Sequence, residues 1–279
     1  NISQNKNEIL ELPENKNDEL YTFGNKNYAY SVMMGDPLGS FYGYRYKGVY
    51  QNVEETYAVN TSGQRILDID GNPVVMKNGD QKVYPGDARY EDVNGDGVID
   101  ENDIVYLGNS NPTLTGGLNF TLRYKKVSLV AAFHGRAGQK VINQARMDME
   151  NMRGKNNQSV AVLRRWRSEG DDTDIPRALY DKGYNYLGSD RFVEDASFLR
   201  LKTVTLKYQM PAKWMKAIGV NKLELYATGY DMFVWTKYKG QDPEVNLKAA
   251  NDGTVAQVAI DSNNTPKPFK IAFGLNLNF

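Results

Sequence analysis

Residues 269–279 at the end of the chain constrain the fold more than any other segment. Apolar side chains occupy every second position there, and the positions between them carry small or polar residues. The apolar set is Phe269, Ile271, Phe273, Leu275, Leu277 and Phe279. Successive side chains of a β-strand point to opposite faces, so this period of two predicts a strand with one wholly apolar face.

The same alternation predicts strands elsewhere in the chain. The clearest pair, 118–124 and 127–134, is separated only by Lys125-Lys126, which reads as a solvated turn. The expected strands are 26–34, 41–51, 118–124, 127–134, 191–209, 222–236 and 269–279. The pattern breaks at 198–201, which predicts a β-bulge or a strand leaving its burial zone. Segments 139–152 and 159–167 have helical spacing instead.

The links that lead into these strands alternate between long and short, at about 20, 6, 61, 2, 54, 12 and 29 residues. Outer-membrane barrels sort their connections in this way, with short turns on the periplasmic side and long loops outside. The mean hydropathy of −0.60 is compatible with a barrel, because only alternate residues face lipid. The pattern therefore favours an all-β transmembrane barrel, and a soluble antiparallel β domain stays open as the alternative.

Composition excludes several classes of function. The chain has no Cys and one His, so thiolate zinc sites, cysteine nucleophiles and two-His metal sites are impossible. Its 34 basic and 34 acidic residues give no net charge, which argues against a nucleic-acid partner. No apolar run is long enough for a transmembrane helix, and the first residues do not resemble a signal peptide.

One local motif points to a metal. Residues 92–103 match D-x-N-x-D-G-x-I-D-x-x-D, the pattern of a twelve-residue calcium loop. The expected Ca²⁺ ligands are Asp92, Asn94, Asp96, the Val98 carbonyl, Asp100 and Asp103. Gly97 permits the sharp turn, and Ile99 anchors the loop in apolar packing. The alternative is an ordinary Asp/Asn/Gly-rich turn.

The metal is expected to be structural rather than catalytic. Position 12 is Asp103 rather than Glu, so its shorter side chain predicts different or weaker binding, and the variant resembles a dockerin-type loop. Without an ion, the four carboxylates would repel one another.

Other candidate sites are weaker. His134 is expected on the polar face beside Arg136, with no Ser or Asp placed to complete a catalytic triad. The tyrosines within 42–50 suggest an aromatic girdle at a membrane interface, or alternatively a carbohydrate-stacking surface. The basic run 164–167 suggests a solvated loop helix, or alternatively a recognition patch.

Several landmarks in one order resemble a known family. They are Gly39–Tyr50, Pro85–Tyr90 leading into the calcium-type loop, Leu107–Asn109, Asp174–Arg177, Ala196–Lys202, Tyr238–Glu244 and the final alternating strand. Together they are similar to the C-terminal barrel portion of a SusC/RagA-type TonB-dependent outer-membrane transporter, and the resemblance spans essentially the whole chain.

The resemblance implies that residues 1–279 supply about the last eight strands of a 22-stranded barrel. It implies extracellular loops at 52–112, which holds the calcium-type loop, and at 137–190, which is partly helical. The plug domain and the rest of the barrel would be supplied by further chain. Implied partners are a SusD-like lipoprotein lid, the TonB complex acting through the missing N-terminal part, and membrane lipid.

The resemblance also implies a function, namely import of oligosaccharides or oligopeptides across the outer membrane of a Gram-negative bacterium, without enzymatic activity. The alternatives are a soluble calcium-stabilised β domain that binds carbohydrate and, more remotely, a glycan-active enzyme.

Overall fold

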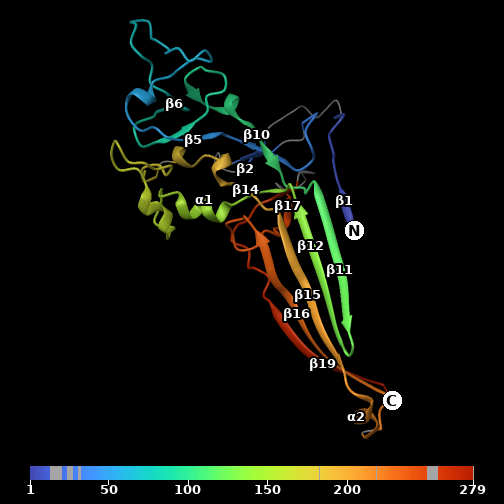
Figure 1. The fold of residues 1–279 in the computed structure, drawn as a ribbon. Coiled ribbons are helices and arrows are strands. Elements are labelled where there is room, and N and C mark those ends of the chain that lie inside the picture. The colour runs from blue at the N-terminus through green and yellow to red at the C-terminus, as the bar shows by residue number, and fades with distance from the viewer. Residues whose placement is uncertain are drawn as a thin grey trace.

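The computed structural model describes residues 1–12, 21–23, 28–30, 33–181, 183–217, 219–249 and 257–278. Its largest element is an antiparallel sheet in the order β1-β11-β12-β15-β16-β19. The strands are β1 (Ile2–Gln4), β11 (Leu114–Tyr124), β12 (Val127–Ala137), β15 (Phe198–Gln209), β16 (Lys222–Thr236) and β19 (Lys270–Asn278). We call the five long strands the wall, and Figure 1 shows them side by side as a tall sheet.

The two faces of the wall differ in polarity. Directly paired residues share a face, and the register links Leu122 to Leu129, Leu129 to Leu206, and Leu225 to Leu275. This apolar face is open: Phe273 is 82% exposed and Leu122 61%. The other face carries polar side chains such as Thr121, Ser128, Thr205 and Asn276. An exposed apolar face backed by a polar one is the pattern of a membrane barrel wall.

The links between wall strands are sorted by end. At one end, β11 and β12 are joined by Lys125-Lys126, and β15 and β16 by a short link that contains α2 (Ala212–Ala217). The links 138–197 and 237–269 leave from the opposite end, as Figure 1 shows. The predicted alternation of connector lengths is confirmed for these four links between the wall strands. Among the described residues, no helix is long and apolar enough to cross a membrane.

The expected irregularity in β15 is present. Its register shifts between Leu201 and Thr203 against β16, and the pairing with β12 shifts at the same level. Relative to β12, Lys202 is therefore an extra residue in β15. On the neighbouring strand β16, Asp231 has a φ of +49°. The bulge rotates the strand locally and turns both side chains towards the polar face.

Above the wall lies a second body, which we call the lobe (the described residues of 28–110, together with 139–196). Its strands are β3 (Tyr28–Tyr30), β4 (Ser40–Gly43), β5 (Tyr46–Val49), β6 (Lys77–Asn78), β7 (Gln81–Lys82), β8 (Ala88–Tyr90), β9 (Val98–Ile99), β10 (Val105–Asn109), β13 (Lys140–Ile142) and β14 (Val193–Asp195). Its helices are η1 (Glu54–Thr56), η2 (Glu101–Asp103), α1 (Gln144–Glu150), η3 (Val160–Arg164), η4 (Tyr184–Tyr186) and η5 (Asp190–Phe192). Near these lie β2 (Tyr21–Phe23), which pairs with β3, and the pair β17 (Leu247–Ala249) and β18 (Gln257–Ala259).

Two predicted wall strands belong elsewhere. Segment 41–51 divides into β4 and β5, which lie in different small sheets, and of segment 26–34 the described part forms β3 beside β4. The large sheet therefore has six strands rather than about eight. Alternation alone could not reveal this, because a strand in a small globular sheet has the same period. Residues 24–27, 31–32 and 279 lie outside the described residues.

The tyrosine girdle was a wrong prediction. Tyr42, Tyr44 and Tyr50 are 3%, 9% and 2% exposed, so they meet neither lipid nor sugar. Tyr44 and Tyr50 pack in one apolar core of the lobe with Met76, Ile99 and others. The predicted helices are also shorter than expected: β13 occupies the start of 139–152, and 159–167 holds only a 3₁₀ helix.

Candidate functional site

The loop 92–103 folds around its own carboxylates. Asp92 accepts hydrogen bonds from the N–H groups of Gly95 (2.7 Å) and Gly97 (2.8 Å), and Asp96 accepts one from Val98 (2.8 Å). Gly95 and Gly97 have φ of +72° and +85°, in the left-handed region that favours glycine. The turn expected at Gly97 is confirmed.

The second half of the loop centres on Asp103, whose side chain is fully buried. Its carboxylate accepts from the N–H groups of Val93 (2.7 Å) and Asp100 (2.9 Å). Burial raises the pKa of Asp103 despite these bonds, and the charges of Asp92 and Asp100 raise it further. Burial, with the charges of Asp103, Asp100 and Glu101, raises the pKa of Tyr44 to about 12.

The donor set fits a hard cation. Asp92, Asn94, Asp96, Val98, Asp100 and Asp103 offer only oxygen, as Ca²⁺ prefers, and the mutual repulsion of the carboxylates would be relieved by a cation. Within the part of the chain that the structure describes, however, no three His, Cys, Asp or Glu side chains gather into a metal cluster. The carboxylates bind backbone N–H groups instead. Calcium binding stays a prediction.

The loop is built into the lobe rather than attached to it. Ile99 is 3% exposed in the core, as predicted for its anchoring role, and β9 pairs in parallel with β6. A Cβ on Gly95 would lie 2.6 Å from the backbone N of Thr61, and one on Gly97 would lie 2.9 Å from Ala58. The loop therefore supports the excursion 57–76, which Figure 1 shows projecting away from the wall.

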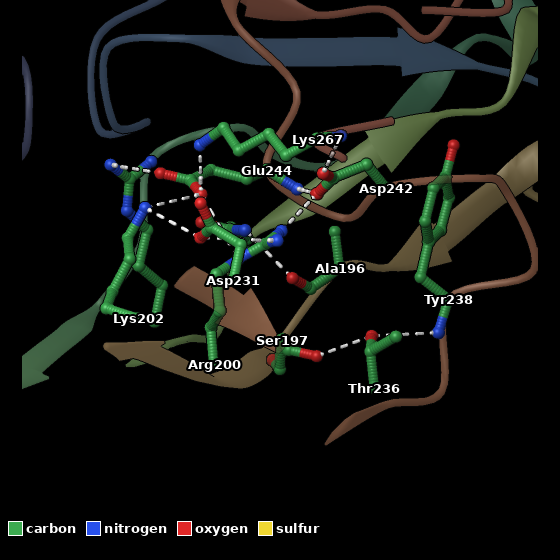
Figure 2. A network of polar contacts seen from close by, with 12 residues as sticks. Ala196, Ser197, Arg200, Lys202, Asp231, Thr236, Tyr238, Asp242, Glu244 and Lys267 are labelled. Carbon is green, nitrogen blue, oxygen red and sulfur yellow. Dashed lines mark hydrogen bonds and ion pairs between the residues drawn. The ribbon is translucent and has the colours of Figure 1, made fainter. Parts of the chain in front are cut away.

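A second constellation lies where the wall meets the link 237–269. Arg200 on β15 is 3% exposed and points into a group of carboxylates (Figure 2). Its guanidinium lies 2.5 Å from Asp242, 3.5 Å from Glu244 and 3.9 Å from Asp231. We call these four residues, together with Lys202 and Lys267, the latch.

The latch cations surround Glu244. Lys267 lies 2.5 Å and Lys202 3.7 Å from its carboxylate. Burial acts to raise the pKa of Glu244, but these cations and Arg200 outweigh it and the pKa is lowered. The latch joins the landmarks 196–202 and 238–244, which are distant in the sequence. Both landmarks are visible in the sequence but their contact is not, because complementary charge is the only signal that connects them.

A further ion pair joins the landmarks 85–90 and 174–177. Asp87 is fully buried, and Arg177 binds it through two bonds of 2.7 and 3.2 Å. Asn185 also donates to Asp87, and the N–H of Arg177 donates to the carbonyl of Gly86. This bidentate pair holds the link 138–197 against the first part of the lobe.

The remaining candidates have structural surroundings. His134 lies on the polar face of β12, as predicted, opposite Arg200 and against Phe198. In the basic run, the ring of Trp166 packs on Gly86, where a Cβ would lie 2.3 Å from it. The run begins at the last residue of the 3₁₀ helix η3, and through Trp166 it contributes packing to the lobe.

Comparison with known proteins gives one consistent answer. No protein-family model matches the chain. It is 33% identical over 284 residues to TonB-dependent receptor P26 of Formosa agariphila, and 26% identical over 290 residues to TonB-dependent receptor SusC of Bacteroides thetaiotaomicron. Both matches cover 100% of this chain, and 26% and 24% of the relatives. The chain thus spans about a quarter of the length of the curated relatives it matches.

Solved structures agree on the fold. The chain superposes on the RagAB peptide importer in its closed-closed state with a TM-score of 0.68 and 24% identity. It superposes on the RagAB peptide transporter with a TM-score of 0.69 and 23% identity. Each match covers 100% of this chain and 26% of that chain.

Fold and wall together define a section of a large antiparallel transmembrane β-barrel. Over its whole length the chain is similar to about a quarter of the TonB-dependent receptors of the SusC type, and the resemblance noted in its sequence to the barrel portion of a SusC/RagA-type protein is confirmed. The continuous apolar face over five strands argues against the alternative of a soluble β domain, because soluble monomers rarely expose such a surface.

Proposed function

We propose that the complete protein imports an oligomeric nutrient, an oligosaccharide in the first place and an oligopeptide as the alternative, across the outer membrane. The observation that carries this is the wall: a lipid-facing apolar side, a polar inner side, and long links gathered at one end. The names of the curated relatives, all TonB-dependent receptors, support an energy supply from TonB. The relatives are receptors and importers, which supports a role without catalysis.

We further propose a SusD-like surface lipoprotein that closes over the lobe as a lid. The lobe projects from the end of the wall that bears the long links, and its excursion 57–76 presents apolar side chains, with Ile69 fully exposed and Leu67 56% exposed. Calcium in the loop 92–103 would fix the base of this excursion, because Gly95 and Gly97 lie against it.

The importer is tested with the complete protein in its own membrane. Deleting its gene should abolish uptake of the cargo oligomers, and disrupting TonB should abolish uptake equally, because the plug opens only when TonB acts. Uptake that persists without TonB would contradict the proposal. Co-purification of the lipoprotein with the intact transporter, and its loss when residues 60–73 are replaced by a short turn, tests the lid.

A further inference from the structure

The inner face of the wall carries an excess of positive charge. The five wall strands contain seven basic residues and two acidic ones, a net charge of +5. The basic residues are Arg123, Arg136, Arg200, Lys202, Lys207, Lys222 and Lys270, and the acidic ones are Glu224 and Asp231. The whole chain has 34 of each, so the remaining residues carry 27 basic against 32 acidic, a net charge of −5. The net charge of zero for the whole chain therefore combines a positive wall with a negative remainder.

The register places these charges on one side. Arg123 pairs with Ser128, Ser128 with Lys207, and Lys270 with Tyr230, all on the polar face. A lipid-facing position excludes charge of either sign. The membrane therefore explains why the charged residues lie on the inner face, but it does not explain why most of them are positive. The excess of cations needs a separate cause.

The acidic residues of the wall do not neutralise its cations. Glu224 is shared between Lys207 (3.8 Å) and Lys222 (4.0 Å), and Asp231 between Arg200 and Lys202. Among the described residues, Arg123 and Lys270 have no acidic partner within ion-pair distance. The path along the inner face therefore offers positive charge that the wall leaves uncompensated.

Aromatic rings lie between the cations. Tyr226 pairs with Lys207 on one side and Gly274 on the other. A Cβ on Gly274 would lie 2.3 Å from the tyrosine ring, so the ring lies directly over the glycine backbone. This leaves its outer surface towards the lumen. Tyr230, 40% exposed, pairs directly with Lys270. A ring face suits stacking of a sugar, and a neighbouring ammonium suits a carboxylate on that sugar.

We propose that the wall selects acidic oligosaccharides, in which uronate carboxylates pair with the lumen cations and the sugar rings stack on Tyr226 and Tyr230. This rests on the proposed import function and names its cargo class. At the mouth, Asp242 and Glu244 of the latch form ion pairs with the cations that an arriving cargo molecule would meet first. An arriving carboxylate would compete with them for Lys202 and Arg136, whose side chains are each 35% exposed.

The test uses the complete transporter with its native partners. Cells receive a pool of acidic oligosaccharides (galacturonate, glucuronate and mannuronate oligomers) and neutral ones of equal length, and mass spectrometry follows their disappearance. The double substitution Arg123→Gln/Lys270→Gln should slow acidic uptake about tenfold and leave neutral uptake within about twofold. Arg123→Lys/Lys270→Arg, which keeps both charges, should restore it. Lys125→Gln/Lys126→Gln removes two cations from the turn outside the lumen and should change neither.

Each possible result either supports or overturns the proposal. Equal slowing of both pools would assign the cations to assembly, for example to pairing with a plug, and would overturn the proposal. Uptake of neutral oligomers alone would overturn it as well and leave the import function standing. Acidic peptides entering in place of acidic sugars would overturn the sugar class. Absence of any TonB-dependent uptake would instead refute the import function on which the proposal rests.

Discussion

The wall and the lobe place the same kinds of residue in opposite surroundings. In the wall, large apolar side chains are exposed, and Phe273 is 82% exposed. In the lobe they are buried, and Tyr50 is only 2% exposed. Charged residues follow the reverse rule: apart from the buried Arg200, those of the wall line the open inner face, whereas Asp87 and Asp103 of the lobe are fully buried. The wall is stabilised by lipid and the lobe by its own core, so substitutions of one type should have different effects in the two regions.

The largest effect is expected from the buried ion pair of the lobe. Arg177→Ala leaves the Asp87 carboxylate without its partner, and an uncompensated buried charge costs about 3–5 kcal/mol. Limited proteolysis of the intact transporter should show the lobe cleaved much faster, while the barrel keeps its heat-modifiable migration on gels. As a control, Glu54→Ala breaks the exposed pair with Arg65 and should cost less than about 1 kcal/mol. Equal proteolysis of the two variants would contradict the role given to Asp87.

Next is the lipid face of the wall. Phe273→Arg places a charge in the hydrocarbon layer at a cost of about 2–4 kcal/mol near its middle. Asn276→Arg puts the same residue on the inner face of the same strand and should be tolerated. The amount of folded barrel in the outer membrane measures both. Similar yields would mean that the faces have been assigned incorrectly.

The metal loop should give a smaller, ligand-dependent effect. Calcium at a hundred times its dissociation constant would stabilise the lobe by about 2.7 kcal/mol. Asp92→Asn keeps one oxygen that can accept from Gly95, but it replaces the oxygen that accepts from Gly97 and removes the charge, so calcium should no longer protect the lobe from proteolysis. Calcium titration of both proteins measures the affinity. The same affinity in the variant would refute the site.

The smallest effect concerns the latch between wall and link. The lowered pKa of Glu244 means that its ionised form favours the folded latch, so its contribution is complete above the unfolded value of 4.5 and is lost as pH falls through the folded value. Because the chain has no cysteine, Val245→Cys introduces its only thiol. Measured relative to a free thiol at the same pH, which corrects for the falling thiolate fraction, labelling of this thiol should accelerate below about pH 4.5. Adding Glu244→Gln should remove that pH step, and a step that persists would assign it to another group.

Much of the wall could be predicted. Residues 222–236 match β16 at both ends, and the polar face of Arg123 and Lys270 followed from their parity in the strands. The break at 198–201 correctly marked the bulge that the structure places at Lys202. The calcium-type loop was also visible in the sequence, with its turn at Gly97 and its anchor at Ile99, because its ligands and turn residues are contiguous.

What failed was the assignment of alternating segments to one sheet. Tyr42 and Tyr44 alternate as a wall strand does, yet they are buried in the lobe. The latch and the Asp87–Arg177 pair also escaped prediction, since their partners lie 42 and 90 residues apart and nothing local specifies which Arg meets which Asp.

The sequence by itself determined which residues alternate, where the chain turns, and that the final strands present an apolar face, because these depend on neighbours one or two positions apart. Only the tertiary structure decided which strands share the wall, which charges meet in the latch, and that the cations collect along one surface while the acidic residues lie elsewhere. Those outcomes depend on register and on long-range packing, which fix the position of a side chain relative to residues far away in the chain.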